Sequence, residues 1–349
     1  MRGGSEAAAG AAEGAGPSRK KRIGVIGSLV WDVIYGRDTR GVPVEEWGGI
    51  TYAMSGLDAA LPDDWEIVPI MMVGEDLAAR AREFLRTLKH MAPDASLMAV
   101  PYPAQRVELR YYSDERRTEH LSGGMPAWTW LALKPLLDDA KLDALLINFL
   151  SGWELDLETT KLIRQHFRGP IHCDLHMMAW AVQPDGLRTL RPIPDIAEWC
   201  RCFDFLQMNE DELATVAPDG MSLAATALAA GVSCLLVTLG KRGAVYFAAP
   251  GFDRITDLPP RKGLATAPRG GMGALGAVRT ALVPAQSVAG PGDPTGCGDV
   301  WCATWFSRMV AGDKLSDAMT AAARAAARNV GHRGATGLAA HLRGELSLS

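Results

Sequence analysis

Short apolar runs alternate with segments of helical length along most of the chain. Such runs predict buried strands at residues 22–28, 66–73, 142–149, 171–174, 203–208, 234–238 and 244–247. Residues 76–89 and 157–167, and a third segment beginning near Asn209, have the spacing of helices. Because strands that alternate with helices build parallel sheets covered by helices, the pattern predicts an α/β fold with a mostly parallel central sheet.

One region breaks this rhythm. Val107, Leu109 and Tyr111 alternate with polar neighbours, residues 113–116 have the composition of a turn, and residues 117–121 predict a return strand. Alternation of this kind is typical of a sheet with one buried and one solvated face. With further strands from residues 30–44, a small β sheet is expected from about residues 30–56 and 100–124, either as a lid or as a plain surface hairpin.

Composition adds a second distinction along the chain. The 349 residues carry a formal charge of −4 and are 48% hydrophobic and 22% charged. That is an ordinary globular balance, which excludes a collagen, a coiled coil, a disordered protein and a nucleic-acid binder that relies on bulk charge. The first 22 residues have five basic and two acidic side chains, so +3 lies there and −7 on the remaining 327.

Residues 1–16 contain five Gly and six Ala and bury nothing large, so residues 1–21 are expected to be a disordered leader before a domain of residues 22–349. The basic run at residues 19–22 either binds nucleic acid or a surface or, as we favour, belongs to a solvated leader or an over-long start of the reading frame. No apolar stretch approaches the roughly 20 residues of a membrane span, so no membrane partner is expected. No nucleic-acid partner is expected because the whole chain is mildly acidic. Residues 259–276, rich in Gly, Pro, Arg and Lys, predict a long loop whose basic side chains are either solvated or in contact with phosphates.

The cysteines indicate a reducing compartment. None of the six forms a C-x-x-C pair, and several lie in apolar runs; they are Cys173, Cys200, Cys202, Cys234, Cys297 and Cys302. Buried free thiols in a cytoplasmic protein are expected. The spacing of Cys200, Cys202, His172 and His176 does not fit a structural zinc site.

The segment from Gly290 to Asp299 carries the clearest chemical signal. A Gly-rich turn here runs directly into a helix with an apolar face that ends before Gly312. The free amide groups and the positive dipole end of a helix N-terminus form an anion site. Asp299, in the first turn, is placed to accept a proton from a hydroxyl that attacks phosphorus, although an ordinary helix-capping Asp has the same local pattern.

Residues 293–299, D-P-T-G-C-G-D, resemble the C-terminal signature of the ribokinase-like, or PfkB, carbohydrate and nucleoside kinases, with Cys297 in the place of Ala. Other family motifs follow in the right order over about residues 22–340. They are residues 27–32, Trp47-Gly48-Gly49, Val73-Gly74-Glu75-Asp76, Asn209-Glu210-Asp211-Glu212, Val237–Gly243, Asn329 and Gly334-Ala335. The resemblance implies a three-layer sandwich with a mostly parallel sheet and a small β lid.

The resemblance also implies ATP-dependent, Mg²⁺-assisted phosphoryl transfer to a hydroxyl of a small sugar, nucleoside or related polyol. Asp299 would be the general base, with the backbone amides of Gly296, Cys297 and Gly298 as an anion hole. The acceptor would contact Asp32, Gly48 and Gly49, and Asn209 and Glu212 would lie in the outer shell of the metal. The implied nucleotide-binding residues are Thr238, Gly240, Gly243, Asp293, Thr295, Asn329 and Gly334.

Two departures from the family pattern concern the acceptor. Ala53 stands where many members have the Asn of G-G-x-x-x-N, and after Asp174 the D-x-N-x-R motif has His176 and Met178 in place of Asn and Arg. The substrate therefore need not be ribose or fructose. His176 either contacts it or is a satisfied polar residue at a strand end.

Several side chains keep two interpretations. Trp31, Tyr52 and Trp180 either stack on a substrate ring or pack in the core. Lys241 and Arg242 either approach phosphates or lie on an exposed turn, and the Cys297 thiol is either redox-sensitive or simply small enough to fit beside phosphate.

Other classes of function are weighed against the kinase. A catalytically inactive ligand-binding or regulatory relative is the alternative, and the altered acceptor motifs favour it while Asp299 and N-x-x-E oppose it. A Rossmann oxidoreductase lacks its G-x-G-x-x-G and a serine hydrolase lacks G-x-S-x-G. A homodimer is expected only by analogy, because lids in this family often pair between subunits.

Overall fold

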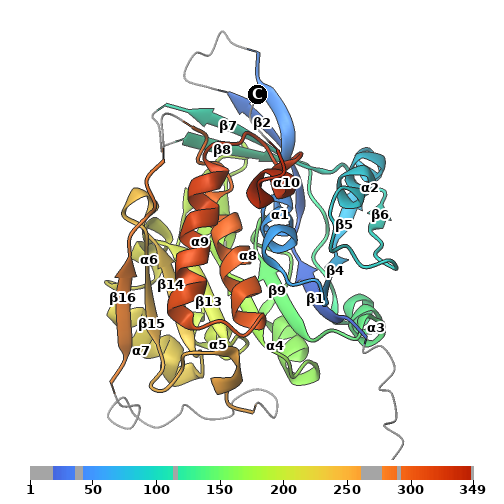
Figure 1. Ribbon diagram of the computed structural model, residues 1–349. Coiled ribbons are helices and arrows are strands. Elements are labelled where there is room, and N and C mark those ends of the chain that lie inside the picture. The colour runs from blue at the N-terminus through green and yellow to red at the C-terminus, as the bar shows by residue number, and fades with distance from the viewer. Residues whose placement is uncertain (1–18, 36–41, 113–116, 261–276, 289–291, 347–349) are drawn as a thin grey trace, which may run out of the picture.

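An eight-stranded sheet forms the centre of the molecule (Figure 1). The computed structural model describes residues 19–35, 42–112, 117–260, 277–288 and 292–346. The strand order is β16-β15-β14-β13-β10-β9-β1-β4, and all neighbours from β14 to β4 pair in parallel while β15 and β16 are antiparallel. The strands are β1 (Lys21–Ile26), β4 (Trp65–Ile70), β9 (Ala144–Asn148), β10 (Ile171–Asp174), β13 (Phe205–Asn209), β14 (Cys234–Thr238), β15 (Ala244–Ala248) and β16 (Arg279–Val283).

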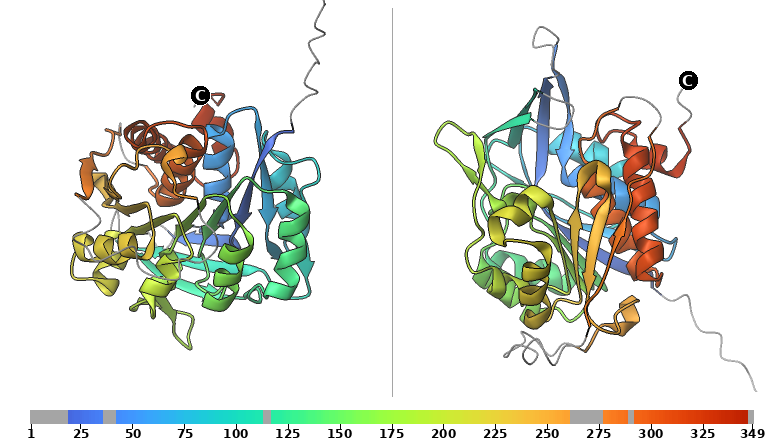
Figure 2. Two further views of the ribbon diagram at one scale, coloured as in Figure 1. Left: turned by 90° about the horizontal axis from the view of Figure 1, so that it is seen from below. Right: turned by 90° about the vertical axis from the view of Figure 1, so that its left-hand side faces the viewer.

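Helices cover both faces of this sheet and make the fold a three-layer sandwich (Figures 1 and 2). One face carries the mutually packed helices α1 (Ile50–Ala60), α8 (Cys297–Val310), α9 (Leu315–Asn329) and α10 (Leu338–Arg343). The other face carries α3 (Trp130–Ala140), α4 (Leu157–His166), α5 (Ile196–Cys200), α6 (Glu210–Val216) and α7 (Gly220–Ala230). Within the described residues no single helix is long and apolar enough to span a membrane, although α6 and α7, bent by 72° at their junction, pass that test as a pair.

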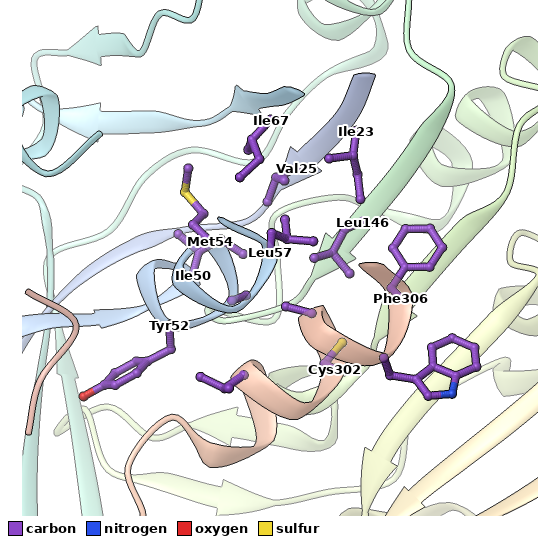
Figure 3. Close-up of a cluster of buried hydrophobic side chains, with 14 of the residues drawn as sticks. Ile23, Val25, Ile50, Tyr52, Met54, Leu57, Ile67, Leu146, Cys302 and Phe306 are labelled. Atoms are coloured by element: carbon purple, nitrogen blue, oxygen red, sulfur yellow. The ribbon is translucent and has the colours of Figure 1, made fainter. Parts of the chain in front are cut away.

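Successive side chains along each central strand point to opposite faces of the sheet, so each strand contributes to the apolar clusters on both faces. In β9, Leu146 belongs to the apolar cluster under α1 and α8, while Leu145 and Ile147 belong to the cluster on the other face. Figure 3 shows side chains of α1 and α8 meeting those of β1 and β9 in the first cluster. The helices approach closely at Gly56, where an added Cβ would lie 3.1 Å from the Cβ of Ala303.

A second sheet of four strands stands beside the carboxyl ends of the central strands. Its order is β3-β2-β7-β8, from β2 (Leu29–Tyr35), β3 (Val44–Gly49), β7 (Gln105–Tyr111) and β8 (Arg117–Ser122). One face of it is apolar through Val30, Ile34, Val107, Leu109 and Leu121. This lid sheet, as we call it, rises above the body in Figure 1.

Smaller elements complete the described chain. A hairpin of β11 (Trp180–Val182) and β12 (Arg188–Leu190) follows the 3₁₀ turn η1 (His176–Ala179) and touches β8 through a bridge between Leu187 and His120. β5 (Met72–Gly74) pairs with β6 (Met98–Val100) beside α2 (Ala78–Arg86). Two further 3₁₀ turns are η2 (Gly240–Arg242) and η3 (Ile255–Asp257).

The α/β architecture expected from the sequence is confirmed, with corrected boundaries. The predicted strand at residues 66–73 is interrupted at Met71, because β5 leaves the central sheet to pair with β6. The predicted lid segment 30–56 was too long, since residues 50–56 belong to α1 and pack against α8. β1 begins at Lys21 and Arg19 pairs with Asp143, so ordered chain starts before the expected residue 22. Leader residues 1–18, and 261–276 of the basic loop, lie outside the described residues.

Candidate active site

Polar side chains follow the carboxyl ends of four neighbouring central strands. Asn148 ends β9, Asp174 ends β10, Asn209 ends β13 and Thr238 ends β14, in that spatial order. The order in which strands are added to the sheet reverses between β1 and β9, because β4 lies on one side of β1 and the later strands lie on the other. Open α/β sheets bind ligands at the carboxyl edge near such a division, so the edge at Asn148 is the place to look.

The N-terminus of α8 points at this edge and begins with a constrained turn. Gly296 caps the helix with φ 73° and ψ 1°, and the Asp293 carboxylate accepts a hydrogen bond from the Thr295 amide at 2.9 Å. The Asn329 side chain, at the end of α9, donates to the Thr295 carbonyl oxygen at 2.9 Å. The turn is therefore held by the helix behind it, with the positive end of the α8 dipole directed at the sheet edge.

Tyr52 explains why position 296 requires glycine. An added Cβ at Gly296 would lie 2.2 Å from two carbon atoms of the Tyr52 ring, and the positive φ disfavours any other residue. The Tyr52 ring thus packs directly on the start of α8. Its hydroxyl is buried and has no hydrogen-bond partner among the described residues, and Figure 3 shows that oxygen turned away from the apolar side chains.

Asp299, in the first turn of α8, is held by a residue that the sequence analysis did not select. The Asn148 Nδ2 donates to the Asp299 Oδ1 at 2.7 Å, and Asn148 is fully buried. Two strands away, the Gln207 Nε2 donates to the Asp174 Oδ2 at 3.0 Å and to the Gly298 carbonyl at 3.3 Å. The available sequence signal for both was an amide side chain in or at the end of a buried apolar strand.

A cavity of about 430 Å³, including its open mouth, lies in front of Asp299; we call it the Asp299 cavity. Its apolar lining comes from the lid sheet and the loops at the strand ends. Its polar and charged lining consists of Asp32, Tyr52, Glu119, His176, Arg188, Thr295 and Asp299. It joins a carboxylate at a helix N-terminus to a wall of hydrogen-bonding groups, an arrangement suited to a small polar molecule.

The lid sheet supplies Asp32 to this cavity. Asp32 is 5% exposed and lies directly over Gly48, where an added Cβ would be 1.9 Å from the carboxylate. Gly48 therefore gives room to Asp32, while Gly49, with φ 59°, lines the cavity itself. Tyr111 of β7 forms a hydrogen bond of 2.7 Å with the Thr295 hydroxyl, which joins the lid sheet to the turn before α8.

The N-x-x-E motif takes part in a hydrogen-bond network at the start of α6. Asn209 and Glu212 form a capping box at the start of α6, and Glu212 is 1% exposed. The Glu212 carboxylate also accepts from the Nδ1 of His176 at 2.7 Å and the Nε1 of Trp180 at 3.4 Å.

These contacts decide whether the motif suits a metal. Both oxygens of Glu212 are engaged, and the Asn209 Oδ1 accepts from the Glu212 amide. The described residues contain no group of three or more His, Cys, Asp or Glu that could hold a metal ion. The side chains of the motif thus do not fit direct metal ligation without losing these bonds, and their outer-shell role through water stays a prediction.

His176 and the carboxylates around it shift each other's pKa values. Burial lowers the pKa of His176, but attraction and hydrogen bonding by Glu212, with Asp174 and Asp299 nearby, outweigh it and raise the pKa to about 9. Burial raises the pKa of Asp174 well above its usual range, and His176 opposes that rise. An imidazolium is therefore present beside Asp299 at neutral pH, where many family members have the Asn of D-x-N-x-R.

The residues assigned to the nucleotide fall into two groups. Thr238, Gly240 and Gly243 lie in and around the β14–β15 turn, beside Asn209 of the adjacent strand. The turn leaves no room at Gly243, where a Cβ would be 2.1 Å from the Val283 carbonyl oxygen.

The second group lies around the turn before α8. Asp293 and Thr295 form the turn itself, and Asn329 anchors it from behind. Gly334 packs instead against Glu46 of the lid sheet, where a Cβ would be 2.2 Å from its Cγ.

Several side chains with two interpretations make packing or surface contacts within the described structure. Trp31 is 8% exposed, meets Trp47 edge-on at 5.1 Å and donates from its Nε1 to Glu45.

Burial raises the pKa of the Cys297 thiol to about 11, and its Sγ contacts Asn329, so the thiol is protonated at neutral pH. Arg242 forms an ion pair with Glu210 on an exposed turn. The described cysteines are all free.

The comparisons agree with this geometry. Residues 182–341 match the model of the pfkB family carbohydrate kinases. A solved sulfate complex of a pyrophosphate-dependent kinase in the ribokinase family has a TM-score of 0.66 and 17% identity, covering 89% of this chain and 96% of that chain. Arabidopsis thaliana ribokinase, complexed with ribose and ATP, has a TM-score of 0.62 and 17% identity, covering 95% and 100%.

Burkholderia thailandensis nucleoside kinase in complex with inosine has a TM-score of 0.63 and 15% identity, covering 91% of this chain and 94% of that chain. No curated protein matches the sequence. At these identities the structures establish a shared fold, and the family model covers the segment that contains Glu212, Asp299 and the turn before α8. The chain therefore has the ribokinase fold, and its residues 182–341 match the pfkB family of carbohydrate kinases.

Proposed function

We propose that the protein transfers a phosphoryl group from ATP to a hydroxyl of a small sugar, nucleoside or related polyol bound in the Asp299 cavity. The observation that carries this proposal is the position of Asp299. Its carboxylate lies in the first turn of α8, lines the cavity and is fixed by the fully buried amide of Asn148. A base and an anion-binding helix end thus face the same space, which phosphoryl transfer to a hydroxyl requires.

The roles follow from the contacts. Asp299 accepts the proton of the attacking hydroxyl, and Asn148 keeps its carboxylate pointing into the cavity. The first amide groups of a helix have no carbonyl partner within it, so the amides of Gly296 to Gly298 and the α8 dipole stabilise charge on the transferring group. The Cys297 amide donates to the Pro294 carbonyl at 3.1 Å, which makes Gly296 and Gly298 the more accessible donors of the three.

The acceptor and the donor approach from different sides. Asp32 and the Gly49 backbone belong to the lid sheet and are proposed to hold the acceptor. Thr238, Gly240 and Gly243 are proposed to border the nucleotide, with Asp293 and Thr295 nearest the phosphates. Asn329 and Gly334 are proposed to shape that side through their packing. Magnesium is proposed to enter with the donor phosphates as part of the substrate, because Asn209 and Glu212 are engaged elsewhere.

Asp299→Asn tests the proposal. ADP release is measured with ATP and Mg²⁺ over a panel of monosaccharides, nucleosides and inositols. Phosphate release is measured with pyrophosphate as a second donor, because one structural neighbour is a pyrophosphate-dependent kinase. Turnover should fall about 10²- to 10⁴-fold in the variant without loss of folding. Asp317→Asn is the matched control, because Asp317 lies in the first turn of the neighbouring α9 and is exposed. Undiminished turnover in Asp299→Asn would refute the assigned base. Thermal stabilisation by a polyol with no ADP release would instead favour a ligand-binding protein.

A further inference from the structure

An ion pair outside every family motif forms one wall of the Asp299 cavity. Glu119 comes from β8 of the lid sheet and Arg188 from β12 of the β11–β12 hairpin. The Arg188 Nη1 lies 3.0 Å from the Glu119 Oε2, and the two side chains are 3% and 9% exposed. Both residues line the cavity.

The guanidinium is fixed but not saturated. Its Nη2 donates to the Leu150 carbonyl at 2.8 Å, so the fork is held by the loop after β9 as well as by Glu119. Its Nε is buried and has no hydrogen-bond partner within the described chain. A guanidinium has five N–H donors, and the bonds to Glu119 and to the Leu150 carbonyl use two of them.

The position of the pair relative to Asp32 limits what that partner is. Asp32 in β2 lies opposite Val107 in β7, and Leu109, two residues on, lies opposite Glu119 in β8. From a strand spacing of about 4.8 Å and a rise of about 3.3 Å per residue, the backbones at Asp32 and Glu119 are about 12 Å apart. Val107 and Leu109 form an apolar floor between them.

We propose that Glu119 and Arg188 are the specificity-determining pair of this enzyme and bind a vicinal diol of an uncharged, single-ring acceptor. This inference rests on the proposed function. Each hydroxyl of a diol both donates and accepts, so Glu119 accepts from one hydroxyl while the Arg188 guanidinium donates to its neighbour. The span from Asp32 to this pair, with an apolar floor, accommodates one ring whose polar edges face the two ends.

The pair also supplies hydrogen-bonding groups for the acceptor that two positions of the family motifs lack in this chain. Ala53 and Met178 stand where the family pattern has an Asn and an Arg, and neither offers a hydrogen bond to a hydroxyl. Arg188 reaches the cavity from a hairpin ten residues beyond Met178, beside the lid sheet, where the Leu121 amide bonds to the Gly186 carbonyl at 2.9 Å. An acceptor seated on the pair would touch the lid sheet and the body at once.

The test combines binding and turnover. Arg188→Gln removes the charge and the fork, and Glu119→Gln/Arg188→Gln keeps a neutral hydrogen-bonded pair in case the single variant leaves an unpaired buried carboxylate. Arg106→Gln is the matched control, because Arg106 pairs with Asp76 at 2.8 Å, belongs to the lid sheet and does not line the cavity. The probes are D-ribose, 2-deoxy-D-ribose, myo-inositol and the anion D-gluconate. Calorimetry measures their binding, and ADP release measures their turnover.

The expected result is a 10- to 100-fold rise in the Kd and KM of the preferred neutral polyol in both Arg188 variants, as for one lost charged hydrogen bond. The KM of ATP stays unchanged. For a monodeoxy acceptor, the same variants raise the Kd and KM by less than threefold. Unchanged polyol affinity in a folded double variant would overturn the inference, as would tighter binding of D-gluconate or no polyol binding at all. Arg188-dependent polyol binding without ADP release from any acceptor would reject the proposed function and keep this inference.

Discussion

Asn148→Leu separates the positioning of the base from the stability of the fold. The bond from Asn148 Nδ2 to Asp299 Oδ1 is 2.7 Å long and is made by a fully buried donor. A hydrogen bond to a charged group contributes about 1.5–3 kcal/mol, and one pH unit corresponds to about 1.4 kcal/mol. Because the donor favours the ionised carboxylate, its loss should move the acid limb of the kcat profile to higher pH by about 1–2 units.

The variant should nevertheless fold. The Asn148 Oδ1 is buried without a partner in the described structure, so leucine removes one unsatisfied acceptor together with the lost donor. Asp299 is half-buried and lines the open cavity, so water can replace the lost donor at its carboxylate. Equilibrium urea unfolding is therefore expected to change little, while catalysis changes strongly.

The assay is kcat against pH from about 4.5 to 8.5, with ADP quantified by chromatography at saturating acceptor. Gln207→Leu is the control, because Gln207 is an equally buried amide that contacts Asp174 and Gly298 rather than the Asp299 side chain. Its acid limb should stay in place. An unshifted limb in a folded Asn148→Leu enzyme would refute the role given to this bond.

Three further outcomes follow from the site. The pKa of His176 is raised to about 9 by Glu212 despite burial, so its contribution to stability is complete below about pH 6.5 and is lost as pH rises through 9. The difference in unfolding free energy between the wild type and His176→Asn should therefore shrink over that interval in urea titrations, and a constant difference would contradict the pairing. Gly296→Ala should cost about 2–5 kcal/mol, from the positive φ and the clash with the Tyr52 ring, and Tyr52→Ala in the same chain should recover part of it in thermal unfolding. Because burial raises the pKa of Cys297 to about 11, iodoacetamide at pH 7.5 should alkylate it far more slowly than free cysteine, as followed by mass spectrometry; rapid labelling would restore the redox interpretation.

The sequence determined the parts of this protein that depend on neighbours along the chain. Apolar runs of strand length, a period of two and a Gly-rich turn before an apolar helix are local patterns, and they placed β10 and β14 at their observed bounds and α8 behind its turn. Asp299 was identified for the same reason, because helix position and turn chemistry are written in consecutive residues.

Tertiary structure alone decided which polar groups meet. Asn148 and Asp299 are 151 residues apart in the chain, and Glu119 and Arg188 are 69 apart, so no local pattern links them. Strand register and the path of the β11–β12 hairpin bring each pair together. The same packing brings His176 to Glu212, 36 residues away in the chain, beside the capping box that Glu212 forms with Asn209.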